Sequence, residues 1–196
     1  PVASAWHRGF GSPSFYTSLT IDQPAHRSSL LRLGSWEAGW QNFTDADVLL
    51  AVGYNPLVSS YGPASGLQGT NPFIKLREAK RRGLKLIVID PRRSELATQA
   101  DVWLQVKPGE DPTLIASMIG HILKFNLHDT SFCEQYVDQV QLRKLKEACS
   151  AFTLEYAAER CDVPSNDIKL AAEMFASGPK GTAGSGTGPN LSLIHI

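Results

Sequence analysis

Three short apolar runs, separated by segments of helical character, constrain the fold of this chain more than any other feature. The runs are Ala46–Gly53, Leu84–Asp90 and Asp101–Val106. They are largely apolar along their length rather than strictly alternating, as expected for strands that are buried on both faces of a sheet. We therefore predict an α/β fold in which a Rossmann-like parallel sheet is covered by flanking helices.

Polar side chains follow each run, where the predicted strands end. Asn55 comes after the first run, Asp90 and Arg92 stand at the end of the second, and Asp111 comes after the third. In open parallel sheets, ligands bind beside the carboxyl ends of the strands. The sequence therefore predicts a crevice at this edge of the sheet that holds a ligand shaped like a nucleotide.

The composition is that of a globular protein without a charge preference for any partner. The chain has 196 residues, of which 42% are hydrophobic, and its 19 basic and 19 acidic residues give a net charge of zero. A neutral chain does not attract nucleic acid or an anionic membrane, so neither is expected as a partner. No apolar stretch approaches the roughly 18–20 residues of a membrane span, so no direct membrane insertion is expected. Cys133, Cys149 and Cys161 are too widely spaced for a CxxC metal site and are expected to be plain thiols.

The chain divides into segments of different character. The expected segments are a loop-rich start (1–43), a Rossmann-like unit (44–128), a helical segment (129–178), the start of a glycine-rich loop (179–190) and a tail that need not be native (191–196). Within the first segment, one helix is predicted near Ala25–Leu33. The chain starts at Pro1 without a Met, so we expect an internal piece of a larger multidomain subunit.

Helix boundaries can be predicted from prolines, glycines and capping residues. Pro72 suits a first helical position and Gly83 the position beyond a helix end, so a helix is predicted over Pro72–Arg82. Asp111 and Pro112 open another helix, with Asp111 as its N-cap. Later helices are predicted at Ser131–Val137, Gln141–Cys149, Leu154–Arg160 and Asn166–Ala176, with Thr153 and Ser165 as the N-caps of the last two.

The charged residues at the strand ends each allow more than one role. Asp90 can accept hydrogen bonds from ribose hydroxyls, or it can form an Asp-Pro turn that caps a following helix. Arg92 can pair with a diphosphate, stack on a base, or make a surface ion pair. Asp111 can cap its helix, or it can accept the two hydrogen bonds that the N1–H and N2–H₂ edge of guanine donates. Adenine offers no such pair of donors.

The glycines favour a ligand that approaches the backbone. Gly53 would let the chain come close to a phosphate, and Asn55 could donate to it. Glycines at alternate positions in Gly181–Gly188 allow a similar approach or mark a flexible turn. The sequence contains no GxGxxG and no GxxxxGK[ST] motif, which argues against an ordinary NAD-dependent dehydrogenase and a P-loop. It also contains no GxSxG nucleophile elbow, so Ser185 is interpreted as a loop hydroxyl.

Several sequence blocks, in their order and spacing, resemble one enzyme family. The blocks are Asp45–Pro56 (DADVLLAVGYNP), Ala79–Ser94 (AKRRGLKLIVIDPRRS) and Ala100–Asp111 (ADVWLQVKPGED), with further likeness at Phe152–Arg160 and around Val163-Pro164. They resemble the large subunit of the molybdopterin oxidoreductases of the dimethyl-sulfoxide-reductase family, which includes formate dehydrogenases, nitrate reductases and thiosulfate or polysulfide reductases. The likeness covers roughly residues 9–190.

The resemblance implies a fragment of a molybdenum- or tungsten-dependent oxidoreductase. Such an enzyme binds bis(molybdopterin guanine dinucleotide) and moves electrons to or from a small substrate. Gly53 and Asn55 are implied to face its diphosphate, and Asp90 and Arg92 the sugar of the guanosine and its surroundings. The guanine would contact Pro108, Gly109 and Asp111. Gly184 and Gly186 would approach the dinucleotide or the pterin.

The resemblance also implies positions for the metal ligand and a catalytic histidine. Relatives supply the ligand from the loop that corresponds to Thr17–His26, where Asp22 is the carboxylate that could coordinate the metal. A neighbouring alignment instead places Ile21 there and leaves no ligand. His26 is the candidate active-site histidine. A 4Fe-4S cluster, if the parent has one, would be held by residues before Pro1.

A relative from another class shares the expected fold. One subunit of respiratory NADH–quinone oxidoreductase is a structural and electron-relay component without molybdopterin. The presence of Asp90, Arg92 and Asp111 favours cofactor binding over this alternative. The expected partners are a small-molecule substrate and an electron-transfer subunit, and the expected location is the cytoplasm, or the periplasm if a twin-arginine signal lies upstream.

Overall fold

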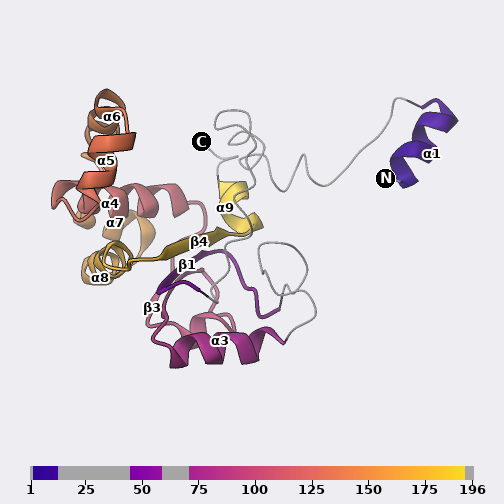
Figure 1. The fold of residues 1–196 in the computed structure, drawn as a ribbon, viewed down its shortest axis with the longest axis horizontal. Coiled ribbons are helices and arrows are strands. Elements are labelled where there is room, and N and C mark those ends of the chain that lie inside the picture. Colours follow the sequence, from indigo (N-terminus) through magenta and orange to yellow (C-terminus); the bar gives the residue numbers. More distant parts are fainter. Residues whose placement is uncertain (1, 13–44, 59–70, 193–196) are drawn as a thin grey trace.

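The computed structural model describes residues 2–12, 45–58 and 71–192 of the chain. Its centre is a four-stranded parallel sheet with the strand order β3-β2-β1-β4 (Figure 1). The strands are β1 (Val48–Val52), β2 (Lys85–Ile89), β3 (Val102–Leu104) and β4 (Gly181–Ser185). A parallel sheet covered by helices confirms the predicted α/β fold class.

The helices of the described residues are α1 (Val2–Phe10), α3 (Pro72–Arg81), a 3-10 turn η3 (Ala97–Gln99), α4 (Asp111–Lys124), α5 (Thr130–Tyr136), α6 (Gln139–Cys149), α7 (Leu154–Cys161), α8 (Ser165–Ala176) and α9 (Thr187–Ser192). The helices predicted from Pro72 to Ala176 are all found, with ends that shift by one or two residues. The helix predicted near Ala25–Leu33 lies outside the described residues.

Helix α1 contradicts the expectation of loop at the start of the chain. Trp6 and Phe10, one helical turn apart, stack with their ring centroids 5.3 Å apart, which is a favourable helical pair. Gly11, with φ of +74°, then ends the helix. The prediction of loop relied on turn signals that begin only at Gly11, so it missed a helix that these residues support locally.

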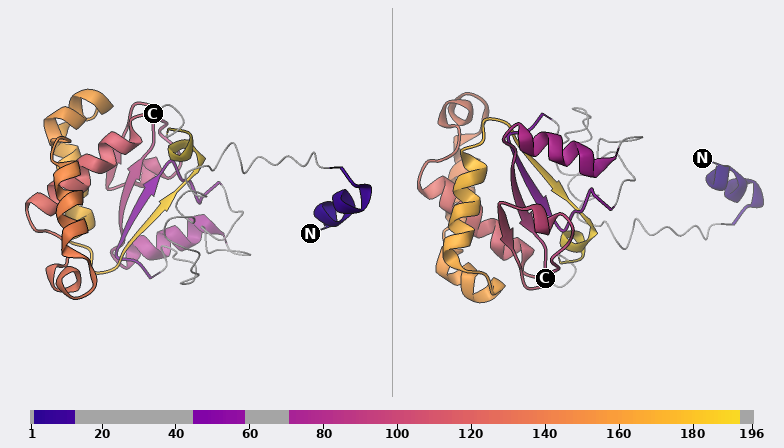
Figure 2. Two further views of the ribbon diagram at one scale, coloured as in Figure 1. Left: turned by 90° about the horizontal axis from the view of Figure 1, so that it is seen from above. Right: turned by 90° about the horizontal axis from the view of Figure 1, so that it is seen from below.

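Both faces of the sheet are buried, which explains why its strands are continuously apolar. Alternate residues of β1 point to opposite faces, with Val48 and Leu50 in one core cluster and Leu49 and Ala51 in the other. Helices α4, α7 and α8 cover the first face, and α3 covers the second (Figure 2). Apolar burial on both faces is the main stabilising contribution to such a sheet.

Side-chain N-caps fix the starts of α3, α5, α6 and α7. The side chain of Asn71 accepts a hydrogen bond from Phe73 N at 3.0 Å at the start of α3. Thr153 accepts one from Tyr156 N at 3.1 Å, which confirms it as the N-cap of α7. The prediction that Ser165 caps α8 is wrong, because Pro164 takes the N-cap position without a side-chain cap and Ser165 is already helical.

The segment expected to begin a glycine-rich loop is instead a strand followed by a short helix. Strand β4 pairs in parallel with β1, with Val48 opposite Gly181 and Val52 opposite Ser185. A Cβ on Gly184 would lie 3.0 Å from Cδ1 of the Tyr54 ring, so glycine allows this close passage. Pairing with the edge of β1 overrides the weak intrinsic strand preference of the sequence GTAGS.

The order in which strands are added to the sheet reverses at β1. From β1 it adds β2 and then β3 on one side, and it returns through α4–α8 to place β4 on the other side of β1. The point where strand order reverses is the usual ligand-binding position of a doubly wound sheet.

Candidate functional site

The carboxyl ends of the four strands form one continuous rim. Because the strands are parallel, the residues that follow them lie at the same edge of the sheet. Backbone hydrogen bonds continue past the strand ends, from Gly53 N to Ile89 O at 2.8 Å, from Asp90 N to Leu104 O at 3.2 Å, and from Gly186 N to Val52 O at 2.9 Å. The ladder therefore holds Gly53, Asp90 and Gly186 at fixed positions along this rim.

Asp90 is 9% exposed and is held in a turn. Its Oδ1 accepts a hydrogen bond from Arg92 N at 2.8 Å, and its backbone oxygen accepts one from Trp103 Nε1 at 2.9 Å. The turn of the second interpretation is present, but the next helical turn begins only at Ala97, so Asp90 does not cap a helix. Among the described residues, Oδ2 has no hydrogen-bond partner, and it can accept from a ligand.

Asn55 connects the loop after β1 to the turn after β2. Its Nδ2 donates to Glu95 Oε2 at 2.8 Å, and its Oδ1 accepts from Leu57 N at 3.2 Å. The amide donor expected to face a diphosphate is therefore directed at a carboxylate in this structure. The backbone N–H of Glu95, then the Asn55 amide, and also the charge of Arg92, hold the pKa of the Glu95 carboxyl below its usual range.

Glu95 is a residue of the rim that the sequence interpretation missed. Its signal was only an acidic residue five positions after Asp90, in a stretch expected to be a turn. An ionised carboxylate beside Asn55 repels an anion, and the guanidinium of Arg92 offsets part of this charge. The charge balance of the rim therefore depends on three side chains rather than on Asn55 alone.

The glycines at the strand ends are used for contact between two chain segments. Gly53 has φ of +55°, and a Cβ there would lie 2.5 Å from Cδ of Pro189. A Cβ on Gly186 would overlap the carbonyl oxygen of Gly53. The N–H groups of both glycines donate within the sheet. These glycines therefore allow the segment that follows β4 to pack closely against the segment that follows β1.

The aromatic ring next to this contact is largely removed from water. The ring of Tyr54 lies beside Gly184, and burial raises the pKa of the Tyr54 hydroxyl to about 12. The hydroxyl therefore stays protonated at neutral pH and is available only as a neutral group.

Pro108, Gly109 and Asp111 form the exit from β3. Gly109 has φ of +95°, and a Cβ there would meet no atom within 4 Å, so open space lies beside this backbone. Lys107 N donates to Cys161 O at 2.9 Å and ties this turn to the end of α7. Asp111 is the first residue of α4 and is 7% exposed.

Glu110, rather than Asp111, occupies the N-cap position of α4, so the predicted cap is wrong by one residue. The Glu110 carboxylate accepts from Thr113 Oγ1 at 2.7 Å and from Arg160 Nη2 at 2.6 Å. These two partners, the Thr113 hydroxyl first, hold the pKa of Glu110 below its ordinary value. Because Glu110 takes the cap position, the Asp111 carboxylate lies in the first turn, where the positive end of the helix dipole favours a negative charge.

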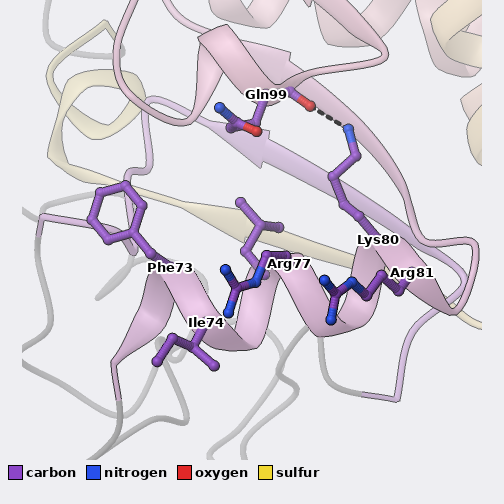
Figure 3. Close-up of a pocket in the computed structure, with 7 residues that line it drawn as sticks. Phe73, Ile74, Arg77, Lys80, Arg81 and Gln99 are labelled. Carbon is purple, nitrogen blue, oxygen red and sulfur yellow. Dashed lines mark hydrogen bonds between the residues drawn. The ribbon is translucent and has the colours of Figure 1, made fainter.

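Two cavities of the described residues lie away from this rim. One, of about 520 Å³, runs beside α3, where Arg77, Arg81 and Ile74 project outward and Lys80 bonds to the backbone oxygen of Gln99 (Figure 3). The other, of about 510 Å³, is bounded by α4, α6, α8 and the start of α7. Neither of these two cavities is lined by Asn55, Asp90 or Asp111.

The described residues contain no group of three or more His, Cys, Asp or Glu side chains that could hold a metal. The predicted metal ligand Asp22 and the predicted catalytic His26 lie outside the described residues. Within the part of the chain that the structure covers, no helix has the length and apolar character needed to cross a membrane.

The fold and its rim place the chain among the doubly wound α/β domains that carry their polar residues at the carboxyl edge. The chain belongs to the molybdopterin oxidoreductase family, because the model of that family, described as "Molybdopterin oxidoreductase", matches residues 11–185. The family resemblance inferred from the sequence blocks is thereby confirmed.

Characterised relatives carry several different activities in their names. The acetylene hydratase of Syntrophotalea acetylenica is 32% identical over 167 residues, which is 85% of this chain and 21% of that protein. The F420-dependent formate dehydrogenase subunit alpha of Methanocaldococcus jannaschii is 34% identical over 67% of this chain and 18% of its own length. The thiosulfate reductase molybdopterin-containing subunit of Salmonella typhimurium is 31% identical over 62% of this chain and 16% of its own length.

A solved structure has the same fold. Acetylene hydratase from Pelobacter acetylenicus aligns with a TM-score of 0.72 and 28% identity over 92% of this chain and 23% of that chain. The chain thus spans about a fifth of the length of the relatives it matches.

Proposed function

We propose that this chain is the part of a molybdenum or tungsten enzyme that holds the guanosine end of a molybdopterin guanine dinucleotide. One observation carries the proposal: in a chain of this family, Asp90 and Asp111 stand at the carboxyl ends of the neighbouring strands β2 and β3. Two carboxylates at adjacent strand ends suit a guanosine, which offers hydroxyl donors on its ribose and a paired N–H edge on its base.

Each carboxylate has a separate part in this proposal. Asp90 Oδ2 accepts from a ribose hydroxyl, while Oδ1 keeps the turn to Arg92 N. Asp111 accepts from N1–H and N2–H₂ of guanine. Pro108 and Gly109 lie just before Asp111, and the open space beside Gly109 leaves room for the flat base.

The diphosphate needs donors other than the glycines of the rim. The N–H groups of Gly53 and Gly186 are already used in the sheet. Arg92 is exposed in the turn after β2, whereas the guanidinium of Arg93 in the same turn lies 5.7 Å from the centroid of the Trp103 ring. Asn55 can donate to a phosphate oxygen only if its amide leaves Glu95. In this proposal Arg92 supplies the main positive charge for the diphosphate. The amide of Asn55 changes its acceptor from the Glu95 carboxylate to a phosphate oxygen.

The group, when bound, supplies the metal-centred chemistry, and this chain positions it. Its residues would fix the nucleotide end through two carboxylates, of which Asp90 has its backbone held by the sheet ladder and Asp111 stands in the first turn of α4. A rigid rim of this kind holds the nucleotide end of a long cofactor at low entropic cost, because the protein groups do not have to be ordered on binding. The metal ligand, the iron–sulfur cluster and the electron-transfer partner remain predictions from the family resemblance.

The test measures GMP released by acid hydrolysis of the full-length polypeptide that contains this chain. We expect about two GMP per bound metal ion, since the family cofactor is a bis(guanine dinucleotide). Asp111→Asn should lower the GMP content, because an amide would place a donor against the donors of guanine. Asp47→Asn is the matched control, since Asp47 is exposed and precedes β1 at the opposite edge of the sheet.

The outcomes distinguish binding of a guanine dinucleotide from the alternative without molybdopterin. GMP in the unchanged protein and in Asp47→Asn, with a loss in Asp111→Asn, supports the proposal. Absence of GMP from purified, fully assembled protein would refute it and favour the non-catalytic electron-relay alternative. An equal loss in both variants would refute the role of Asp111.

The reaction of the whole enzyme has two candidates. Electron transfer to or from a small substrate fits relatives named formate dehydrogenase and thiosulfate reductase. Hydration fits the acetylene hydratase relative, which aligns with 85% of this chain. Addition of water to acetylene involves no net transfer of electrons, whereas oxidation of formate releases two. Reduction of a viologen dye by formate would support the first candidate, and consumption of acetylene without a dye would support the second.

A further inference from the structure

The second cavity combines features that the proposed function does not use. It has a volume of about 510 Å³, is open to solvent on one side, and is lined by residues of α4, α6, α8 and the start of α7. This volume lies within the range of about 300–1,000 Å³ that is usual for small-molecule sites. The helices that form it lie together on one side of the sheet (Figure 1).

Three lysines from three different helices line this cavity. They are Lys124 of α4, Lys146 of α6 and Lys169 of α8, and Glu155 is the only acidic residue among the lining residues. Lys124 and Lys146 have no ion-pair partner among the described residues, and Lys169 reaches Glu173 Oε1 only at 3.9 Å. The cavity therefore carries an excess of positive charge in a chain whose net charge is zero.

Helix dipoles alone do not explain this arrangement. Lys124 and Lys146 lie in the last turns of their helices, where a cation is favoured. That effect would be the same if each side chain pointed separately into solvent. Instead, a close crossing brings the two helix ends together: a Cβ on Gly120 would lie 2.9 Å from Cys149 O. Glycine at this position allows residues of both helix ends to line one cavity.

The other lining residues include aromatic rings that give the cavity an apolar part. Phe125 and Phe152 line it, and Lys124 Nζ lies 5.6 Å from the centroid of the Phe125 ring. His121 is 6% exposed, packs on Phe125 at 4.7 Å between ring centroids, and bonds through Nε2 to Glu173 Oε1 at 3.2 Å. These contacts fix the position of the His121 ring among the lining residues.

We propose that this cavity binds a small organic phosphate that has a flat apolar part. The ammonium groups would donate charge-assisted hydrogen bonds to the phosphate oxygens, and the phenylalanine rings would cover the apolar part. The site is separate from the rim at the carboxyl edge and does not depend on the cofactor proposed there.

The test is isothermal titration of the full-length polypeptide that contains this chain with phenyl phosphate, inorganic phosphate and phenol. Phenyl phosphate should bind more tightly than inorganic phosphate, and phenol should not bind. The double variant Lys124→Gln with Lys146→Gln should weaken binding of phenyl phosphate at least about tenfold, because it removes two charged donors. Added KCl should weaken it as well.

A matched control removes the same charge elsewhere. Lys144 lies on α6 outside the cavity, and Lys75 lies on α3, so Lys75→Gln with Lys144→Gln should leave the affinity unchanged. The amide signals of Gly120 and Phe125 should shift in NMR spectra when phenyl phosphate is added.

Two results would overturn the proposal. One is absence of binding by phenyl phosphate at millimolar concentration in a chain that circular dichroism shows to be folded. The other is an equal loss of affinity in both double variants. Since no molybdopterin is involved, neither result bears on the dinucleotide site.

Discussion

The contact between Gly186 and Gly53 allows a sharp prediction about stability. In Gly186→Ala, the new methyl group would overlap the carbonyl oxygen of Gly53, and backbone rather than a flexible side chain would have to move. Overpacking of this kind costs about 1–3 kcal/mol. Displacement of the strand end would also lose the hydrogen bond from Gly186 N to Val52 O, which contributes about 1 kcal/mol. We expect a total loss of about 2–4 kcal/mol, a large part of the stability of an ordinary domain.

Two other glycines give matched controls. A Cβ on Gly188 meets nothing within 4 Å, and Gly188 lies in α9, so Gly188→Ala should be neutral or stabilising by about 0.5–1 kcal/mol. A Cβ on Gly109 also meets nothing, but its φ is +95°, so Gly109→Ala should cost about 1–2 kcal/mol from backbone strain alone. The three variants therefore separate steric overlap, backbone strain and helix propensity.

The measurement is urea unfolding of the chain, followed by fluorescence and by circular dichroism. Trp103 is a suitable probe because it lies in β3 and donates to Asp90 O. Amide exchange should also speed up across β4 in Gly186→Ala. If Gly186→Ala and Gly188→Ala unfold at the same urea concentration, the strand ends do not touch as described and the steric argument fails.

Three further predictions concern capping, pH and thiol reactivity. Thr153→Ala should lower the free energy of unfolding by about 1 kcal/mol, whereas Ser165→Ala should change it little, because only Thr153 caps its helix; equal effects in thermal unfolding would contradict this. Hydrogen bonds from Thr113 and then from Arg160 lower the pKa of the Glu110 carboxyl in the folded chain. The ionised carboxylate therefore stabilises the fold at pH values above its ordinary pKa of 4.5, and this stabilisation is lost as the pH falls through the lower pKa of the folded state. Glu110→Gln should therefore make the free energy of unfolding fall less steeply below pH 4.5 than in the unchanged chain, and an identical pH dependence would refute the argument. Burial raises the pKa of Cys161 to about 11 and also raises that of Cys149, so a thiol reagent at pH 8 should label Cys133 in the native chain, and the other two only after denaturation.

The sheet was predictable because its strands are buried on both faces. Leu86, Ile87, Val88 and Ile89 are all fully buried, and a continuous apolar run is the sequence signature of such a strand. Strand β4 carried no such signature, since it contains no large apolar residue. Its conformation is decided by pairing with β1, a long-range contact that no local pattern encodes.

The candidate site was predictable in its position more than in its contacts. The polar residues at strand ends could be placed at one edge because parallel strands end together. The register between strands decides that the N–H groups of Gly53 and Gly186 donate to neighbouring strands. The hydrogen bond from Asn55 to Glu95 joins residues that lie 40 positions apart. Neither could be derived from spacing along the chain, so the distribution of donors at the rim was not predictable.

The position of β4 in the chain has a consequence for the order of folding during synthesis. Strand β1 lies inside the finished sheet between β2 and β4, yet β4 is not made until residues 181–185. While the ribosome produces α4 to α8, the hydrogen-bonding groups along one side of β1 have no strand to pair with, and such an open edge invites association with other chains. The nascent polypeptide therefore passes through a vulnerable interval that closes only when the glycine-containing strand arrives.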